Sequence, residues 1–157
     1  MKICFIWIGK TNEQWLQEGI DVYLKRLKHY APLTIDIVTT PKNTPKNDVE
    51  KQKEMEGNAI LGRISNIDEV YLLEERGQTY SSIELAEFLQ KKMLSSAKRL
   101  VIVGGGAFGF SEKVYNRANG QISFSKLTFS HQMIRLLLCE QIYRAFTIIR
   151  GEQYHHK

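Results

Sequence analysis

Short apolar runs and helical repeats of apolar residues alternate along the chain. The run Ile3–Ile8 is apolar at every position, which predicts a first strand buried on both faces. Leu33, Ile35 and Ile37 alternate with polar residues and predict a second strand over 33–40. Further strands are expected at 69–74, 100–103 and 121–124.

Between these strands, apolar residues recur with helical spacing. In the first helix they are Leu16, Ile20, Tyr23, Leu24 and Leu27. Thr11 with Gln14, and later Ser81 with Glu84, form capping-box patterns ahead of a helix. Other helices are expected over 48–64, from 111 and over 131–149. This alternation predicts an α/β fold: a mainly parallel sheet with helices on both faces.

Proline and glycine mark the expected turns. Ala31-Pro32 ends the first helix, because proline disfavours helical geometry in the residue before it. Arg76-Gly77 is expected to turn the chain out of the third strand. The segment 41–48 holds two prolines and is expected to be an exposed loop.

Length and composition narrow the class of protein. The 157 residues are expected to form one domain, 1–157, and no apolar run approaches the roughly 18 residues of a membrane span. Cys4 and Cys139 fall in apolar segments and are expected to be core thiols in a reducing cytoplasm. No residues have metal-ligand spacing. The net charge of +5 favours an acidic partner such as RNA.

A glycine-rich turn after the fourth strand is the first candidate site. Gly104, Gly106 and Gly109 match the dinucleotide pattern G-x-G-x-x-G, in the strand–turn–helix setting that it requires. The acidic residue expected about 20 positions later is missing, since no Asp or Glu lies between Glu112 and Glu140. No Lys follows the last glycine, which excludes a P-loop. The turn predicts a small-cofactor site or a purely structural glycine turn.

The C-terminal third carries the second candidate. The helix over 131–149 is apolar nearly all round, which predicts burial in the core or against a partner chain. Glu140 and Arg144 stand four apart within it, so they form either an ordinary ion pair or part of a functional site. The tail then brings Tyr154 and His155, and histidine is a common general base near neutral pH.

At these residues the sequence closely resembles the RlmH family of SPOUT-class methyltransferases, which methylate N3 of a pseudouridine in 23S ribosomal RNA. The ordered matches are Lys2, Ile3, Gly9 and Lys10; Tyr23, Arg26 and Leu27; Glu56-Gly57; Leu73-Glu74 and Gly77; the glycine turn; and the segments SFSKLTF-x-HQM-x-R, EQ-x-YRAF and RGE-x-YH. These matches run from end to end of the chain. They are more specific than any glycine pattern alone.

The resemblance implies a fold, a cofactor and partners. The C-terminal part would form a deep trefoil knot that binds S-adenosylmethionine, and a homodimer would let the tail of one subunit complete the site of the other. Implied cofactor contacts are Leu73, Gly104, Phe124, Ser125, Lys126, Leu127, Thr128 and Phe129. Implied catalytic or substrate-binding residues are His131, Glu140, Arg144, Tyr154 and His155.

Two residues depart from the family pattern. Ser130 replaces the usual proline before His131, and serine is suited to cap the helix that follows. His156 precedes Lys157 at the end, so either residue is a candidate for the terminal cation.

Methyl transfer of this kind needs orientation and a base, but no metal. We expect His155, or a water held by Glu140, to be that base, and Arg144 with the terminal cation to hold phosphate or a carbonyl oxygen. The expected partner is 23S ribosomal RNA within the assembled ribosome. Two alternatives remain: a catalytically silent ribosome- or RNA-binding module of the same fold, and a nucleotide-dependent oxidoreductase.

Overall fold

Strands and helices alternate throughout the part of the chain that the structure describes. The computed structural model describes residues 1–40, 44 and 47–155. In chain order its elements are β1 (Lys2–Ile8), α1 (Gln14–Leu27), β2 (Leu33–Val38), α2 (Val49–Leu61), β3 (Glu69–Thr79), α3 (Ser82–Leu94), β4 (Arg99–Gly104), α4 (Glu112–Arg117), β5 (Gly120–Ser123) and α5 (Met133–Ile149).

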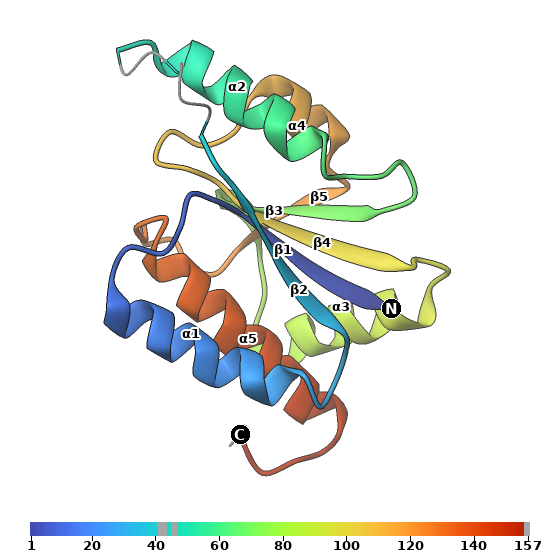
Figure 1. Cartoon of the computed structure of the whole chain (residues 1–157). Helices are drawn as coiled ribbons and strands as arrows, with labels where there is room; N and C mark the ends of the chain where they lie inside the picture. The colour runs from blue at the N-terminus through green and yellow to red at the C-terminus, as the bar shows by residue number, and fades with distance from the viewer. Residues whose placement is uncertain (41–43, 45–46, 156–157) are drawn as a thin grey trace.

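The strands form one parallel sheet between two layers of helices. Its order is β2-β1-β4-β3-β5, and each neighbouring pair is parallel. Helices α1, α3 and α5 cover one face, and α2 and α4 cover the other (Figure 1). The expected α/β class and the parallel sheet are therefore confirmed. No helix in the described ranges is long and apolar enough to cross a membrane.

The strand period of two places a separate core on each face of the sheet. In β1, Ile3, Phe5 and Trp7 pack under α1, α3 and α5. Cys4 and Ile6 point the opposite way, toward α2 and α4. Because β1 is buried on both faces, its sequence is apolar without alternation.

The two expected capping boxes have different outcomes. The backbone N–H of Glu84 donates to Ser81 Oγ at 3.2 Å, and the backbone N–H of Ser81 donates to Glu84 Oε2 at 2.6 Å, so this box is confirmed. The box at Thr11 is wrong: α1 begins after Glu13 with no side-chain cap. Thr11 Oγ1 instead accepts a hydrogen bond from Arg135 Nη1 at 3.2 Å.

The expected turn at Arg76-Gly77 is also wrong. Strand β3 continues to Thr79, and its pairing with β5 shifts register between Leu73 and Gln78. A side chain at Gly77 would lie 2.7 Å from the backbone of Ile122, so this glycine allows two strands to approach closely. The expected loop 41–48 lies largely outside the described residues.

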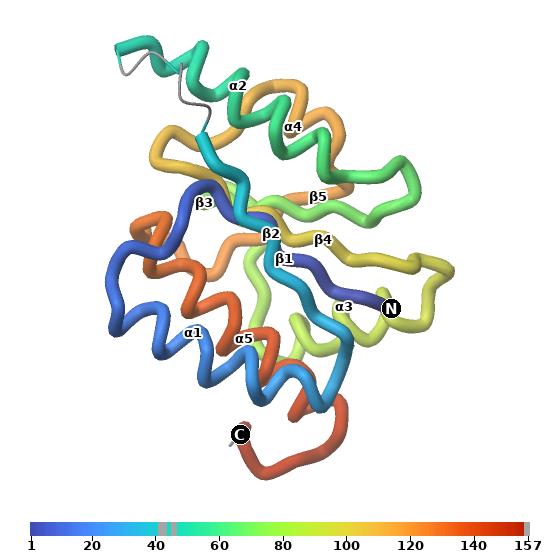
Figure 2. Tube along the Cα trace, viewed as in Figure 1, coloured from blue at the N-terminus to red at the C-terminus, as the bar shows by residue number. Residues whose placement is uncertain are grey.

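Helix α5 lies between α1 and α3 on one face of the sheet (Figure 2). It begins at Met133, two residues later than expected, and every one of its residues is at least partly covered within one chain. Cys139 is among its buried residues, and Cys4 is buried on the other face, so both thiols are core residues as expected. Burial within one chain therefore accounts for part of the apolar surface of α5, at Leu138, Ile142 and Phe146 among others.

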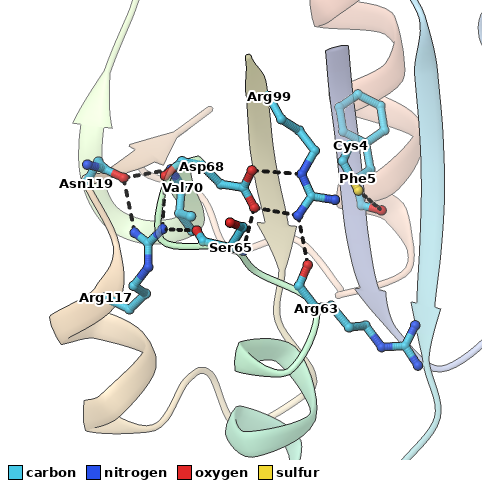
Figure 3. Close-up of polar contacts among 9 residues, drawn as sticks. All are labelled: Cys4, Phe5, Arg63, Ser65, Asp68, Val70, Arg99, Arg117 and Asn119. Atoms are coloured by element: carbon cyan, nitrogen blue, oxygen red, sulfur yellow. Dashed lines mark hydrogen bonds and ion pairs between the residues drawn. The ribbon is translucent and has the colours of Figure 1, made fainter. Parts of the chain in front are cut away.

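A cluster of charged residues lies at the amino ends of β3 and β4. Asp68 is buried and accepts hydrogen bonds from Arg99 Nε at 3.0 Å and from Arg99 Nη2 at 2.5 Å (Figure 3). Arg117 Nη2 donates to the carbonyl oxygens of Ser65 and Asp68. Burial acts to raise the pKa of Asp68, but the hydrogen bonds from Arg99 and Ser65 and the nearby arginine charges outweigh it, so the pKa is lowered.

We expect Asp68→Asn to lower the free energy of unfolding by about 2 kcal/mol at neutral pH. A carboxylate whose pKa is lowered by folding stabilises above its ordinary pKa of 3.8, and that contribution is lost as the pH falls through the lower folded value. The difference between the two proteins should therefore shrink toward pH 2. Urea denaturation across this pH range measures it, and a difference independent of pH would contradict it.

Candidate cofactor cleft and active site

A cleft of about 330 Å³ opens at the carboxyl ends of β4 and β5, beside residues 73–75 in the middle of β3. Its wall is formed by Leu73, Glu74, Glu75, Gly105, Gly106, Ala107, Gly109, Phe110, Ile122, Ser123, Phe124, Ser125, Leu127, Thr128, Phe129, Ser130, His131 and Ile134. Ligands of parallel α/β sheets bind outside the carboxyl ends of the strands, and this volume is in the range of small-molecule sites.

The glycine turn forms one wall of the cleft. Gly109 adopts a positive φ of 78°, which favours glycine. A Cβ on Gly106 would lie 2.9 Å from Glu56 Oε2, because this buried carboxylate fills the space behind the turn. Glu56 Oε1 accepts hydrogen bonds from Gln52 Nε2 at 3.0 Å and Thr40 Oγ1 at 3.3 Å. At its glycine positions the turn therefore presents backbone to a ligand.

The segment between β5 and α5 forms the opposite wall. Ser125 Oγ accepts a hydrogen bond from the backbone N–H of Leu127 at 2.9 Å, and Ser123 Oγ donates to the carbonyl of Ser125 at 2.9 Å. Ser130 Oγ accepts a hydrogen bond from the backbone N–H of Met133, the first residue of α5, at 3.1 Å, but the N-cap position of α5 is Gln132 and not Ser130. These local bonds fix the path of the segment beside the cleft.

Most of the residues expected to contact the cofactor line this cleft. They are Leu73, Phe124, Ser125, Leu127, Thr128 and Phe129. Lys126 and Gly104 do not. Gly104 is buried at the end of β4, and a Cβ there would lie 3.3 Å from Trp7 Cδ1. Gly105 and Gly106, which the sequence did not single out as contacts, line the cleft in its place.

His131 is the one expected catalytic residue that lines the cleft. Burial lowers the pKa of His131, and the charge of Arg135 lowers it further, against an opposing effect of Glu56. His131 is therefore neutral at physiological pH. A neutral imidazole offers one donor and one acceptor nitrogen to a ligand.

Three of the other four expected catalytic residues contact one another: Glu140 and Arg144 on α5, and Tyr154 in the tail after it. Arg144 Nη2 donates to Glu140 Oε1 at 2.5 Å, which confirms the predicted pair. Tyr154 OH donates to the same oxygen at 3.2 Å, and the guanidinium of Arg144 lies 4.7 Å from the centre of the Tyr154 ring. Burial, a hydrogen bond with Tyr23 and the charge of Glu140 raise the pKa of Tyr154. The Nδ1 atom of His155 is buried without a partner among the described residues.

Within one chain the two groups of residues stay apart. Ile134 lines the cleft, whereas Arg144 lies ten residues further along α5, roughly 15 Å at 1.5 Å per residue. None of Glu140, Arg144, Tyr154 and His155 lines the cleft. The candidate terminal cations, His156 and Lys157, fall outside the described residues.

Acidic residues are a feature of the cleft that the sequence did not reveal. Glu74 and Glu75 follow Leu73 within β3, just past the point where its pairing with β4 stops, and no Lys or Arg is among the described residues that line the cleft. Their position directly after an apolar strand segment could have indicated this, because the carboxyl ends of neighbouring parallel strands meet at one edge of the sheet. Together with apolar walls, the two carboxylates suit a ligand that combines an apolar group with positive charge.

Comparison with known proteins identifies the family of this chain. A family model described as "Predicted SPOUT methyltransferase" matches residues 1–155. Proteins named "Ribosomal RNA large subunit methyltransferase H" are similar over their whole length. Those of Flavobacterium johnsoniae and Parabacteroides distasonis are 49% and 47% identical over 157 residues, which cover 100% of each chain. The chain therefore belongs to the SPOUT methyltransferase family.

Proposed function

We propose that this protein is an S-adenosylmethionine-dependent methyltransferase that methylates N3 of a pseudouridine in 23S ribosomal RNA. The observation that carries the proposal is the cleft, which lies at the carboxyl ends of β4 and β5 and combines exposed glycine backbone, apolar walls and two carboxylates. Full-length relatives with ribosomal RNA methyltransferase names support the choice of substrate.

The residues present fit S-adenosylmethionine. Gly105 and Gly106 leave backbone open where an adenosyl group would approach, and Leu127 and Phe129 offer apolar contact. The cofactor carries a net positive charge, which Glu74 and Glu75 would attract. Bound there, it supplies an electrophilic methyl group.

The protein residues then orient the substrate and move one proton. The glycine turn and the segment 124–129 hold the reacting groups in line, which supplies part of the rate enhancement. His155, or a water held by Glu140, takes the proton from N3. Arg144 and a terminal cation, His156 or Lys157, hold phosphate or a carbonyl oxygen. The buried Nδ1 of His155, which has no partner among the described residues, supports a role for this side chain in holding a further polar group.

A homodimer would join the two separated groups of residues, because the tail of one subunit would reach the cleft of the other. The distance along α5 between the cleft and Arg144 supports this arrangement. We also propose that the chain is knotted. The close approach of Gly77 in β3 to Ile122 in β5 supports that threading.

The chain has a net charge of +5, which favours RNA as a partner. We propose that the substrate is the assembled ribosome in the cytoplasm, because a single small domain would read a target by shape. Strong methylation of protein-free RNA would contradict that part of the proposal. The competing function is a catalytically silent ribosome-binding module, which would bind ribosomes without binding S-adenosylmethionine.

The test is transfer of a labelled methyl group to ribosomes from cells lacking this protein, with the product mapped by mass spectrometry. We expect one methylated pseudouridine in large-subunit RNA. His155→Ala should lower turnover about 100-fold with little change in cofactor affinity, because a general base contributes roughly 10²–10⁴-fold.

The outcomes separate the alternatives. Cofactor binding without transfer to ribosomes would point to another RNA. If the wild-type protein neither bound S-adenosylmethionine nor transferred a methyl group, the catalytically silent ribosome-binding module would be favoured. Equal losses of turnover and affinity in His155→Ala would contradict its role as the base.

A further inference from the structure

The cofactor cleft is acidic although the protein as a whole is basic. The chain carries a net charge of +5, but the charged residues of the cleft wall are Glu74 and Glu75. The titratable His131 beside them is kept neutral by burial and by Arg135. Acidic side chains therefore gather at the cleft of a chain that is basic as a whole, and binding RNA does not explain them.

Glu74 is held in place by hydrogen bonds to both carboxylate oxygens. Tyr115 OH donates to Glu74 Oε2 at 2.7 Å, and the backbone N–H of Glu75 donates to Glu74 Oε1 at 3.1 Å. Glu74 is also partly buried, whereas Glu75 is exposed. A fixed and partly desolvated carboxylate acts on a nearby charge more strongly than a mobile, solvated one.

Tyr115 joins two parts of the cleft without lining it. It extends from α4, and its ring contacts the ring of Phe110 edge-on at 5.8 Å. Its hydroxyl lies 3.8 Å from where a Cβ of Gly109 would be. Burial, the hydrogen bond to Glu74 and its charge raise the pKa of Tyr115 to about 12, so the hydroxyl remains a donor at physiological pH. Tyr115 thus ties Glu74 on β3 to the glycine turn after β4.

We propose that Glu74, positioned by Tyr115, selects the cofactor by its charge: it favours S-adenosylmethionine over the demethylated product S-adenosylhomocysteine. This inference rests on the proposed function. The two compounds share adenosine, the amino group and the carboxylate, and they differ in the methyl group and the positive sulfonium. A carboxylate in the cleft stabilises the sulfonium form and contributes little to the neutral thioether. Methyl transfer removes the positive charge, so the product is held less strongly by Glu74 and is released more readily.

The alternative role for Glu74 is a hydrogen bond to the ribose hydroxyls. That contact would be equal for both compounds, so affinity for the pair of ligands separates the two roles. Isothermal titration calorimetry of S-adenosylmethionine and S-adenosylhomocysteine measures both affinities on the full chain. Glu87→Gln is a matched control, because Glu87 is an exposed glutamate on α3 outside the cleft.

We expect Glu74→Gln to raise the dissociation constant of S-adenosylmethionine about tenfold and that of S-adenosylhomocysteine less than about twofold. Tyr115→Phe should act in the same direction by about threefold, because it frees the Glu74 side chain. When Tyr115→Phe is combined with Glu74→Gln, it should cause almost no further change in the ratio of the two dissociation constants. A merely structural role of Tyr115 would instead weaken both ligands equally in either background.

Each outcome decides a separate point. Equal weakening of both ligands by Glu74→Gln would overturn selection by charge, as would no change at all. An effect of Glu87→Gln as large as that of Glu74→Gln would assign the difference to net charge rather than to the cleft, and would overturn the inference too. If the wild-type chain bound neither ligand, the cofactor assignment itself would fail. Thermal melts of each variant confirm that it is folded, and Tyr115→Phe tests the idea independently if Glu74→Gln does not fold.

Discussion

A chain in which Gly77 is replaced by alanine should lose about 3 kcal/mol of its free energy of unfolding. The added Cβ would lie 2.7 Å from the carbonyl carbon of Gln121 and 2.7 Å from the backbone nitrogen of Ile122. Such contacts are shorter than folded proteins accept, and backbone atoms cannot rotate away as a side chain can. Strands β3 and β5 would have to separate, although their pairing forms one wall of the cleft.

Urea denaturation followed by circular dichroism measures this loss, with Gly62→Ala as the control. Gly62 ends α2 with φ −62°, and the nearest atom to an added Cβ is the carbonyl oxygen of Asn58 at 3.5 Å. Alanine fits there without strain, so we expect a gain of about 0.5 kcal/mol from the less flexible unfolded chain. A Gly77→Ala protein as stable as Gly62→Ala would show that the two strands do not approach this closely.

The fold could be predicted from sequence where local signals and packing agree. The apolar run of β1 and the capping box at Ser81 are properties of neighbouring residues, and both predictions hold. The predictions of a capping box at Thr11 and of a turn at Gly77 were wrong for a common reason. Each residue has a local pattern typical of a cap or a turn, but contacts with residues more than 40 positions away decide its role. Such contacts leave no periodic signal in the sequence.

The candidate site shows the same limit. The glycine turn and the segment 124–129 were found because glycine content and family motifs are visible in the sequence. No acidic residue lies about 20 positions after the turn. In the structure, Glu74 comes from β3, which precedes the turn in sequence but lies beside β4 in the sheet. Strand order therefore brings an acid to the cleft that linear spacing cannot reveal.

Arg135 is the largest charged side chain in the core, and its exposed fraction is 1%. It has no carboxylate partner among the described residues. Its guanidinium donates to the carbonyl oxygens of Ile8 at 2.5 Å and Gly9 at 3.0 Å, and to Thr11 Oγ1 at 3.2 Å. The group also lies 5.4 Å from the centre of the Trp7 ring. Burial lowers the pKa of Arg135 to about 10, which leaves it charged at neutral pH. Arg135 thus ties the loop after β1 to the start of α5.

Arg135→Met should therefore lower the free energy of unfolding by about 3 kcal/mol, measured by urea denaturation at neutral pH. Two effects oppose each other: methionine removes a charge that is costly to bury, but it leaves the carbonyls of Ile8 and Gly9 without their donor. Several charge-assisted hydrogen bonds are lost at once, so the second effect should be larger. Arg150→Met is the matched control, because Arg150 is exposed beyond the other end of α5 and should cost less than about 1 kcal/mol. An Arg135→Met protein more stable than the wild type would mean that the cost of burying the charge exceeds the gain from its hydrogen bonds.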